Sequence, residues 1–477
     1  MPVPGDRRRE LVLAACLIAT FMAAVESTIV ATVIPTIVAD LGGFSVFTWV
    51  FTVFLLTQAV SIPIYGRLAD MYGRKPVFYF GTGLFVLSTI LCGVAWSMPS
   101  LIIFRAAQGL GAGAIQPIAA TILGDIYTPA ERGRVQGLVS SVFGVSAVVG
   151  PSLGAFLVAH FSWRAVFWVN VPIGVASILM IGAFLRETVD HRARRIDWAG
   201  SLLLFVAVGG LMLALVQRGL LAWPATIIGL IAGIVLYLHE RLTPEPMLPL
   251  ELWKIRVIAV GSLGNLTAGA MMMGVAAFLP TYIQGAMGSS ALVGGLVLGA
   301  MSVSWAPASF AGGRLMLRTG YRTVALIGGA SLVIGCLMLV MMKPADGPWF
   351  AAWGSFVMGI GMGCCTTVFI VSAQAAVPWG QRGAATSSLM FLRFVGQSSG
   401  AAGCGAVLNA TVQGIDPGAA VDRLLDHAAR AAMPAAEITH LTDVMSVSLH
   451  NAYLLATGFA VLTLCIAACL PARLSPK

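Results

Sequence analysis

Three ionisable side chains interrupt long apolar stretches of the sequence: Glu26, Arg105 and Arg393. A charged group in such surroundings is costly, so one that is kept there marks a functional site by default. Burial disfavours a charged carboxylate and a nearby arginine favours it, so a carboxyl between these influences can hold a proton in one state and release it in another. Glu26 and Arg105 therefore predict proton transfer. Arg393 either lines a pocket or extends its charge to the aqueous interface.

The composition indicates that these residues lie in a membrane protein. Of the 477 residues, 58% are apolar and only 10% are charged, whereas soluble domains carry about 25% charged residues. This excludes a cytosolic enzyme, a nucleic-acid binder and a disordered chain. The net charge of +9 does not change this conclusion, because most basic residues fall in short connections between apolar runs. The eight cysteines all lie in apolar stretches without metal-ligand spacing, and we expect them to be small buried hydrophobes.

Fourteen apolar segments reach the length of about 20 residues that one membrane crossing needs. They predict an all-α polytopic membrane protein with spans near 11–37, 47–69, 77–97, 100–124, 134–159, 163–185, 196–216, 222–238, 257–284, 290–312, 322–342, 348–377, 384–411 and 451–471. Basic residues concentrate in alternate connections, which predicts that both termini are cytoplasmic. The one sizeable outer segment, about 412–450, is expected to be a solvated cap with a short surface helix over 419–436, and a ligand-recruiting role is the alternative.

An internal repeat divides the predicted spans into two halves. Residues 66–75 are similar to residues 313–322, 247 positions later, and the glycine run at 109–113 recurs at 359–363, 250 positions later. Both copies of each pair face the same side, as in parallel repeats related by an axis along the membrane normal. We therefore predict a six-helix bundle over 1–190, two inserted helices with a cytoplasmic linker over 191–255, and a second six-helix bundle over 256–477.

These features resemble the major facilitator superfamily, and several motifs resemble its fourteen-helix drug–proton antiporter branch. Residues 66–75 look like the family's signature between helices 2 and 3, and residues 101–109 resemble its fourth-helix motif. Residues 144–154 resemble the fifth-helix motif associated with antiporters, and three stretches resemble the branch itself: 26–35, 163–174 and 393–396. The resemblance covers essentially the whole chain and implies the major facilitator fold, with a midplane cavity between the halves.

The resemblance also implies a cytoplasmic latch that holds the halves together in the outward-facing state. Its residues would be Gly66, Asp70, Gly73 and Arg74, and an ordinary capped turn is the alternative. An aspartate near a helix N-terminus is stabilised by the helix dipole and by neighbouring arginines. The second copy has Leu317 in place of Asp70, so a gating role of the aspartate would belong to the first half alone.

In the antiporter motif, Gly144, Gly150, Pro151 and Gly154 are expected to let the fifth helix kink and pack closely against a neighbour. The alternative is that these residues serve helix packing alone. Close helix packing is also the main part of the functional role that the motif implies.

The fold that the resemblance implies would place the first and fourth spans together at the cavity wall. Glu26, which stands where the branch more often has aspartate, would then meet Arg105 directly or through water. The alternative is a buried pair that only fixes helix packing. The corresponding positions of the second half, Met273 and Ser355, are uncharged, which favours a function, because a packing need common to both halves would be expected in both.

A candidate substrate pocket is predicted from aromatic and methionine side chains, since flexible methionines suit promiscuous binding. For any single one of these residues, lipid-facing or core packing is the more common role. The predicted set is Trp49, Phe54, Met273, Phe278, Trp305 and Arg393.

The motifs that the sequence lacks restrict the possible energy sources for transport. None of the four lysines follows a glycine, so no phosphate-binding G-x-x-x-x-G-K-[ST] loop exists and direct use of ATP is excluded. No metal or cofactor constellation occurs, and two G-x-S-x-G stretches lie in apolar helices rather than in the strand-to-helix turn of a hydrolase. A single carboxylate is better suited to bind a proton than a metal ion, because a metal-ion site needs several oxygen ligands.

The sequence thus predicts a proton-coupled exporter of hydrophobic, cationic or amphiphilic compounds in a bacterial inner membrane. Its expected partners are a small-molecule substrate, protons and the lipid bilayer, without nucleic acid or ATP, and it is expected to be monomeric. A cationic substrate would compete with the proton for the Glu26 carboxylate. One alternative is an exporter of a dedicated lipid, siderophore or metabolite, and another is a receptor or scaffold that moves nothing.

Overall fold

The computed structural model describes residues 6–127, 129–187, 197–216, 222–243, 250–378, 382–416, 421–425, 430 and 432–471. These residues form helices joined by short turns, with no strand among them. In lipid a helix satisfies every backbone hydrogen bond within its own segment, so long apolar runs of this kind fold as helices.

The N-terminal bundle is built from seven helical segments and one 3-10 turn among the described residues. They are α1 (Asp6–Leu41), η1 (Phe44–Val46), α2 (Thr48–Tyr72), α3 (Arg74–Gly93), α4 (Met98–Ile126), α5 (Pro129–His160), α6 (Ala165–Trp168) and α7 (Asn170–Phe184).

The inserted pair and the C-terminal bundle follow. The pair is α8 (Trp198–Val216) and α9 (Ala222–Leu242). The bundle is α10 (Leu250–Trp253), α11 (Arg256–Ala276), α12 (Leu279–Thr281), η2 (Tyr282–Ala286), α13 (Ala291–Thr319), α14 (Tyr321–Met341), η3 (Pro344–Asp346), α15 (Gly347–Ala375), α16 (Arg382–Ile415), η5 (Val421–Leu424) and α18 (Ala435–Ala468).

Helical segments lie over each of the fourteen predicted spans, and the spans 163–185 and 257–284 each comprise more than one segment. Within the described ranges, eleven helical segments are long and apolar enough to cross a membrane. The other three predicted spans correspond to α5, α8 and α16. The all-helical polytopic fold is confirmed, while the count of fourteen crossings and the cytoplasmic termini stay predictions.

Two details differ from the predictions, and a third falls only partly on described residues. The 412–450 segment is a shorter connection, because α18 begins at Ala435 and its first turns carry the polar residues that lowered the hydropathy there. The helix expected over 419–436 falls only partly on described residues: Val421–Leu424 form the 3-10 turn η5, and Arg430 and Ala432 are helical. Six cysteines are buried as predicted, but Cys465 and Cys469 are exposed on the last turns of α18.

The internal repeat is visible in the backbone. Gly73 and Gly320, which are 247 positions apart, end α2 and α13 with φ of 93° and 87°. Both are positive values that favour glycine. A Cβ on Gly109 would overlap the carbonyl of Phe54, and a Cβ on Gly359 would overlap the carbonyl of Met301, again 247 positions on from Phe54. The two halves therefore use the same close helix packing at equivalent places.

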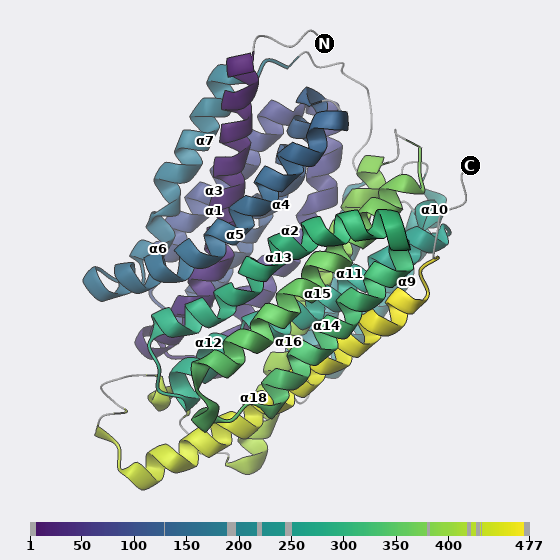
Figure 1. Cartoon of the computed structure of the whole chain (residues 1–477). Helices are drawn as coiled ribbons and strands as arrows, with labels where there is room; N and C mark the ends of the chain where they lie inside the picture. The colour runs from purple at the N-terminus through teal and green to yellow at the C-terminus, as the bar shows by residue number, and fades with distance from the viewer. Residues whose placement is uncertain are drawn as a thin grey trace.

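The halves contact each other through α2 against α16 and α5 against α13. Among the described residues, three hydrogen bonds join them near the end of the bundle where α1 ends. They run from Ser398 Oγ to the Thr52 carbonyl at 3.0 Å, from Asn409 Nδ2 to the Ser45 carbonyl at 3.0 Å, and from Gln284 Nε2 to the Thr32 carbonyl at 3.3 Å. In Figure 1 the N-terminal bundle (purple to blue) and the C-terminal bundle (green to yellow) diverge toward the end at which α1 begins.

Candidate functional site

A buried carboxylate on α1 forms the centre of the candidate site. Oε1 of Glu26 accepts hydrogen bonds from Nη1 of Arg105 at 2.5 Å and from Nε2 of Gln108 at 3.0 Å. Oε2 accepts one from Nδ2 of Asn170 at 2.6 Å. Glu26 is 0% exposed and Arg105 is 1% exposed. The predicted meeting of Glu26 and Arg105 is confirmed, and it is direct.

The donors are themselves held by neighbouring helices. Nη1 of Arg105 also donates to Oε1 of Gln108 at 2.6 Å, and Nε2 of Gln108 donates to Oγ1 of Thr89 at 2.7 Å. Nε of Arg105 donates to the Val50 carbonyl at 3.3 Å, and its guanidinium lies 4.0 Å from the ring centroid of Phe54. Side chains and backbone of α1, α2, α3, α4 and α7 therefore enclose one carboxylate.

Local sequence explains how these side chains converge. Ser97 caps the start of α4 in a reciprocal capping box with Ser100, which fixes where this helix begins. Arg105 and Gln108 are three residues apart on α4 and so lie on one face. Asn170 is the first residue of α7, after a short connection from α6, so its amide faces α1 from the end of a helix.

Sequence reasoning missed Gln108, Asn170 and Thr89 as members of this cluster. Uncharged polar residues are frequent in transmembrane helices, where they hydrogen-bond across helix contacts. Asn170 lies within the 163–174 motif, and a polar side chain at the start of a span was the available signal.

The arrangement can hold or release a proton at one defined atom. Oε1 of Glu26 accepts from two side chains, whereas Asn170 is the one donor to Oε2 among the described residues. Oδ1 of Asn170 is buried and has no hydrogen-bond partner. An asparagine amide offers donors on one side and an acceptor on the other. Rotated by half a turn, it would accept a hydrogen bond from a protonated Oε2.

The predicted latch region is held within the N-terminal half. Nη2 of Arg74 pairs with Asp125 at 3.0 Å and Nη1 with Glu187 at 3.5 Å. The carboxylate of Glu187 also accepts from the backbone nitrogens of Arg74 at 2.8 Å and Lys75 at 2.9 Å, so it caps α3. The side chain of Asp70 lies outside the part of the chain that the structure describes. Gly66 lies within α2, and a Cβ there would meet open space.

The antiporter-motif glycines have different neighbours on α5. A Cβ on Gly150 would overlap Oγ1 of Thr28, and one on Gly154 would come within 2.9 Å of Ile29, so these two positions let α5 pack closely on α1. Gly144 instead lies in a shallow groove of about 410 Å³ between α5 and α13. The side chain of Pro151 is outside the described residues.

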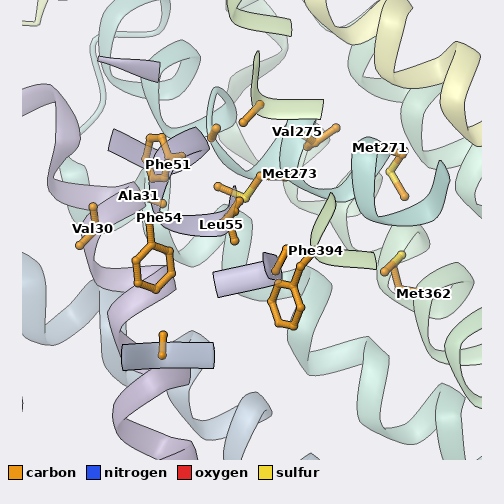
Figure 2. Close-up of a cluster of buried hydrophobic side chains, with 14 of the residues drawn as sticks. Val30, Ala31, Phe51, Phe54, Leu55, Met271, Met273, Val275, Met362 and Phe394 are labelled. Atoms are coloured by element: carbon orange, nitrogen blue, oxygen red, sulfur yellow. The ribbon is translucent and has the colours of Figure 1, made fainter. Parts of the chain in front are cut away.

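The predicted pocket residues differ in their burial and in their neighbours. Phe278 is fully buried, with its ring centroid 6.0 Å from that of Phe47, so it belongs to the contact between the halves. Phe54 lies beneath Arg105. Figure 2 shows Met273 among buried apolar side chains of both halves, including Leu55.

The remaining three pocket candidates keep some exposure. Trp305 on α13 and Arg393 on α16 are half-buried and lie together, with the guanidinium 5.2 Å from the ring centroid of the indole. Trp49 is half-buried at the start of α2.

Relatives with curated names are transporters. The chain is 34% identical over 471 residues to multidrug resistance protein 3 of Bacillus subtilis (strain 168), covering 94% of this chain and 92% of that protein. It is 34% identical over 410 residues to the multidrug transporter protein MdtP of the same organism, covering 84% of this chain and 76% of that protein. Efflux pump FUS6 of Gibberella moniliformis is 30% identical, with 85% and 75% covered.

Solved structures agree on the fold. A bacterial homologue of the human lysosomal transporter Spinster, in an inward-facing and unoccupied conformation, matches with a TM-score of 0.64 at 18% identity, covering 99% of this chain and 100% of that chain. A mutant of the nucleoside transporter NupG matches with a TM-score of 0.64 at 11% identity, covering 97% of this chain and 100% of that chain. These likenesses show the fold alone.

The relatives and the fold point to a polytopic transporter rather than an enzyme. The sequence profile of the Major Facilitator Superfamily matches residues 16–401. The chain therefore belongs to the major facilitator superfamily.

Proposed function

We propose that this protein is a proton-coupled exporter of hydrophobic and amphiphilic compounds that works by alternating access. The observation that carries the proposal is the Glu26 carboxylate, sealed by Arg105, Gln108 and Asn170 within the N-terminal bundle. A buried ionisable group in a membrane protein is costly and defaults to a functional role. The relatives named as multidrug transporters support the substrate class.

Coupling would run through the arrangement of helices around Glu26. The carboxylate touches side chains from α3, α4 and α7 directly or through Gln108, so protonation at Oε2 weakens its charge-assisted contacts and changes how these helices hold α1. Because Glu26 is fully buried, a substrate cannot compete for it directly in this arrangement. Proton and substrate would then exclude each other by favouring different arrangements of the halves.

The proposed topology places both termini in the cytoplasm of a bacterial cell, with bundles over 1–190 and 256–477 and the inserted helices over 191–255. In this topology the halves are joined on the outer side, and the arrangement corresponds to the inward-facing state. The proposed latch at Asp70 and Arg74 would form between the halves only in the opposite state, which agrees with Arg74 pairing inside its own half here. The exporter is proposed to act as a monomer.

Inverted membrane vesicles test this function. An imposed proton gradient should be partly dissipated when a hydrophobic cation such as ethidium is added, and vesicles without the protein should not respond. A response to lipids but to none of a panel of hydrophobic drugs would instead indicate a dedicated endogenous substrate. The absence of any substrate-dependent proton release would contradict the proposal.

A further inference from the structure

We propose that Arg393 and Trp305 form a binding site for the acidic group of an amphiphilic substrate. The inference deepens the proposed export function by naming a substrate class: an apolar body that carries a carboxylate, sulfonate or phosphate. It starts from the charge of one arginine that nothing among the described residues balances.

Arg393 has no polar partner within the described residues. Its contact with Trp305 is a cation–π interaction with a distance of 5.2 Å to the ring centroid, and its Nε is buried without a hydrogen bond. One turn further on α16, the side chain of Gln397 is 4% exposed and likewise forms no hydrogen bond to a described residue. Residues four apart lie on one helix face, so two unpartnered polar side chains occupy the same side of α16.

No carboxylate on the long helices of the C-terminal bundle balances this charge. The sequences of α11, α13, α14, α15 and α16 contain neither aspartate nor glutamate. The two acidic residues of α18, Glu437 and Asp443, lie in the first three turns of that helix, and Glu437 pairs with Arg423. On the other half, Glu26 is already bound by Arg105. A half-buried charge without a counter-ion is unfavourable, so an anion from outside the protein would complete the arrangement.

The two arginines of the membrane region differ in their surroundings. Arg105 is 1% exposed, pairs with a carboxylate, and donates to an amide and to a backbone carbonyl. Arg393 is half-buried and keeps its donors free of described partners. The hydrogen bonds of Arg105 are completed within the fold, whereas Arg393 has surface left for a ligand.

The chemistry of both side chains fits an acidic amphiphile. A guanidinium presents parallel N–H groups that match the two oxygens of a carboxylate, sulfonate or phosphate. The indole of Trp305 offers an apolar face for the body of the same molecule. Because both residues are half-buried rather than sealed, a ligand can touch them without rearrangement of the fold.

A matched set of fluorescent probes tests the site in the full-length protein, reconstituted in phosphatidylcholine nanodiscs. The probes are 11-(dansylamino)undecanoic acid, its primary amide, and the amine of the same chain length. The wild-type protein should bind the acid about tenfold or more tightly than the amide or the amine, because only the acid forms the charge-assisted bonds. Arg393→Met should weaken acid binding by about the same factor and leave amide binding unchanged.

Arg314→Met is the matched control, because Arg314 lies 4.1 Å from the ring centroid of Phe310 on the same helix as Trp305 and is outside the proposed site. It should keep the wild-type preference. Equal binding of acid and amide by the wild-type protein overturns the proposal, whether or not any variant folds, and so does an acid preference that survives in Arg393→Met.

Competition experiments distinguish a soluble amphiphile from a lipid headgroup as the source of the acidic group. Displacement of the acid probe by dodecanoate assigns the site to a soluble amphiphile, and displacement by phosphatidylglycerol assigns it to a lipid headgroup. Either result supports the anion site. The probe experiments measure binding, so a negative result there does not bear on the proposed proton coupling. Likewise, a negative proton-release assay does not bear on the preference for the acid probe.

Discussion

The amide of Asn170 donates a 2.6 Å hydrogen bond to Oε2 of Glu26 and joins the first residue of α7 to the middle of α1, 144 residues away. This bond serves the one carboxylate oxygen that Arg105 and Gln108 do not reach. In the proposed coupling, Oε2 is therefore the atom that would take up the proton, and Asn170 is a positioning residue.

Replacing Asn170 by leucine tests this role. The variant loses the only donor to Oε2 among the described residues, so the ionised carboxylate is less favoured and the pH at which transport is half-maximal should rise. We expect a rise of about one unit, because a hydrogen bond to a charged group contributes roughly 1.5–3 kcal/mol and one unit corresponds to about 1.4 kcal/mol. The measurement is the pH profile of substrate efflux from proteoliposomes.

Asn265→Leu is the control for that profile. Asn265 is also buried, but its amide donates to the carbonyl of Gly261 in its own helix, in the other half. It should leave the pH midpoint unchanged. An unshifted midpoint in the Asn170 variant would contradict the assignment of Oε2.

The glycines of α5 predict a position-dependent effect of one methyl group. Gly150→Ala places a Cβ against Oγ1 of Thr28 and should destabilise the packing of α5 on α1 by about 1–3 kcal/mol. Gly144→Ala meets open space and should be tolerated. Thermal unfolding in detergent, followed by tryptophan fluorescence, measures both. Equal melting temperatures for the two variants would argue against close packing at Gly150.

The turn glycines predict a matching effect in both halves. Gly73→Ala and Gly320→Ala force an L-residue to φ of 93° and 87° and should each cost about 1–2 kcal/mol. Gly66→Ala, which adds a methyl group within a helix and into open space, should not destabilise. The same melting experiment measures all three variants. If Gly66→Ala were as harmful as Gly73→Ala, backbone strain would not be the cause.

The spans, the repeat and the meeting of Glu26 with Arg105 could be predicted from the sequence. Each leaves a strong one-dimensional signal: a long apolar run, a fixed offset, or a charge where charge is costly. The start of α18 could not be predicted, because Glu437, His440 and Asp443 make the first turns of this helix polar. Hydropathy finds the part of a helix that crosses lipid and misses the part that extends beyond it.

The neighbours of Glu26 were less predictable for a different reason. Gln108 and Asn170 are ordinary polar residues in the sequence, and only the crossing of α4 and α7 with α1 brings them to one carboxylate. Phe278 packs against Phe47 at the contact between the halves, and residue type alone does not distinguish a ring that lines a cavity from one that closes a helix contact.

The latch proposal predicts a loss of transport without a loss of binding. Asp70→Asn and Arg74→Gln should each reduce the rate of efflux several-fold while substrate affinity, measured by equilibrium binding, stays the same. Arg322→Gln is the control, since Arg322 is exposed at the start of α14 in the second copy of the repeat. Full efflux activity of Asp70→Asn would count against the latch.

The central claim is that Glu26 carries the coupled proton, and simultaneous measurement of substrate and proton flux in proteoliposomes tests it most directly. Glu26→Gln is compared with Glu10→Gln, which changes an exposed carboxylate on the same helix. The account predicts that substrate-dependent proton movement falls by about a hundredfold in Glu26→Gln and stays at the wild-type level in Glu10→Gln. Undiminished proton movement with substrate in the Glu26→Gln protein would contradict it.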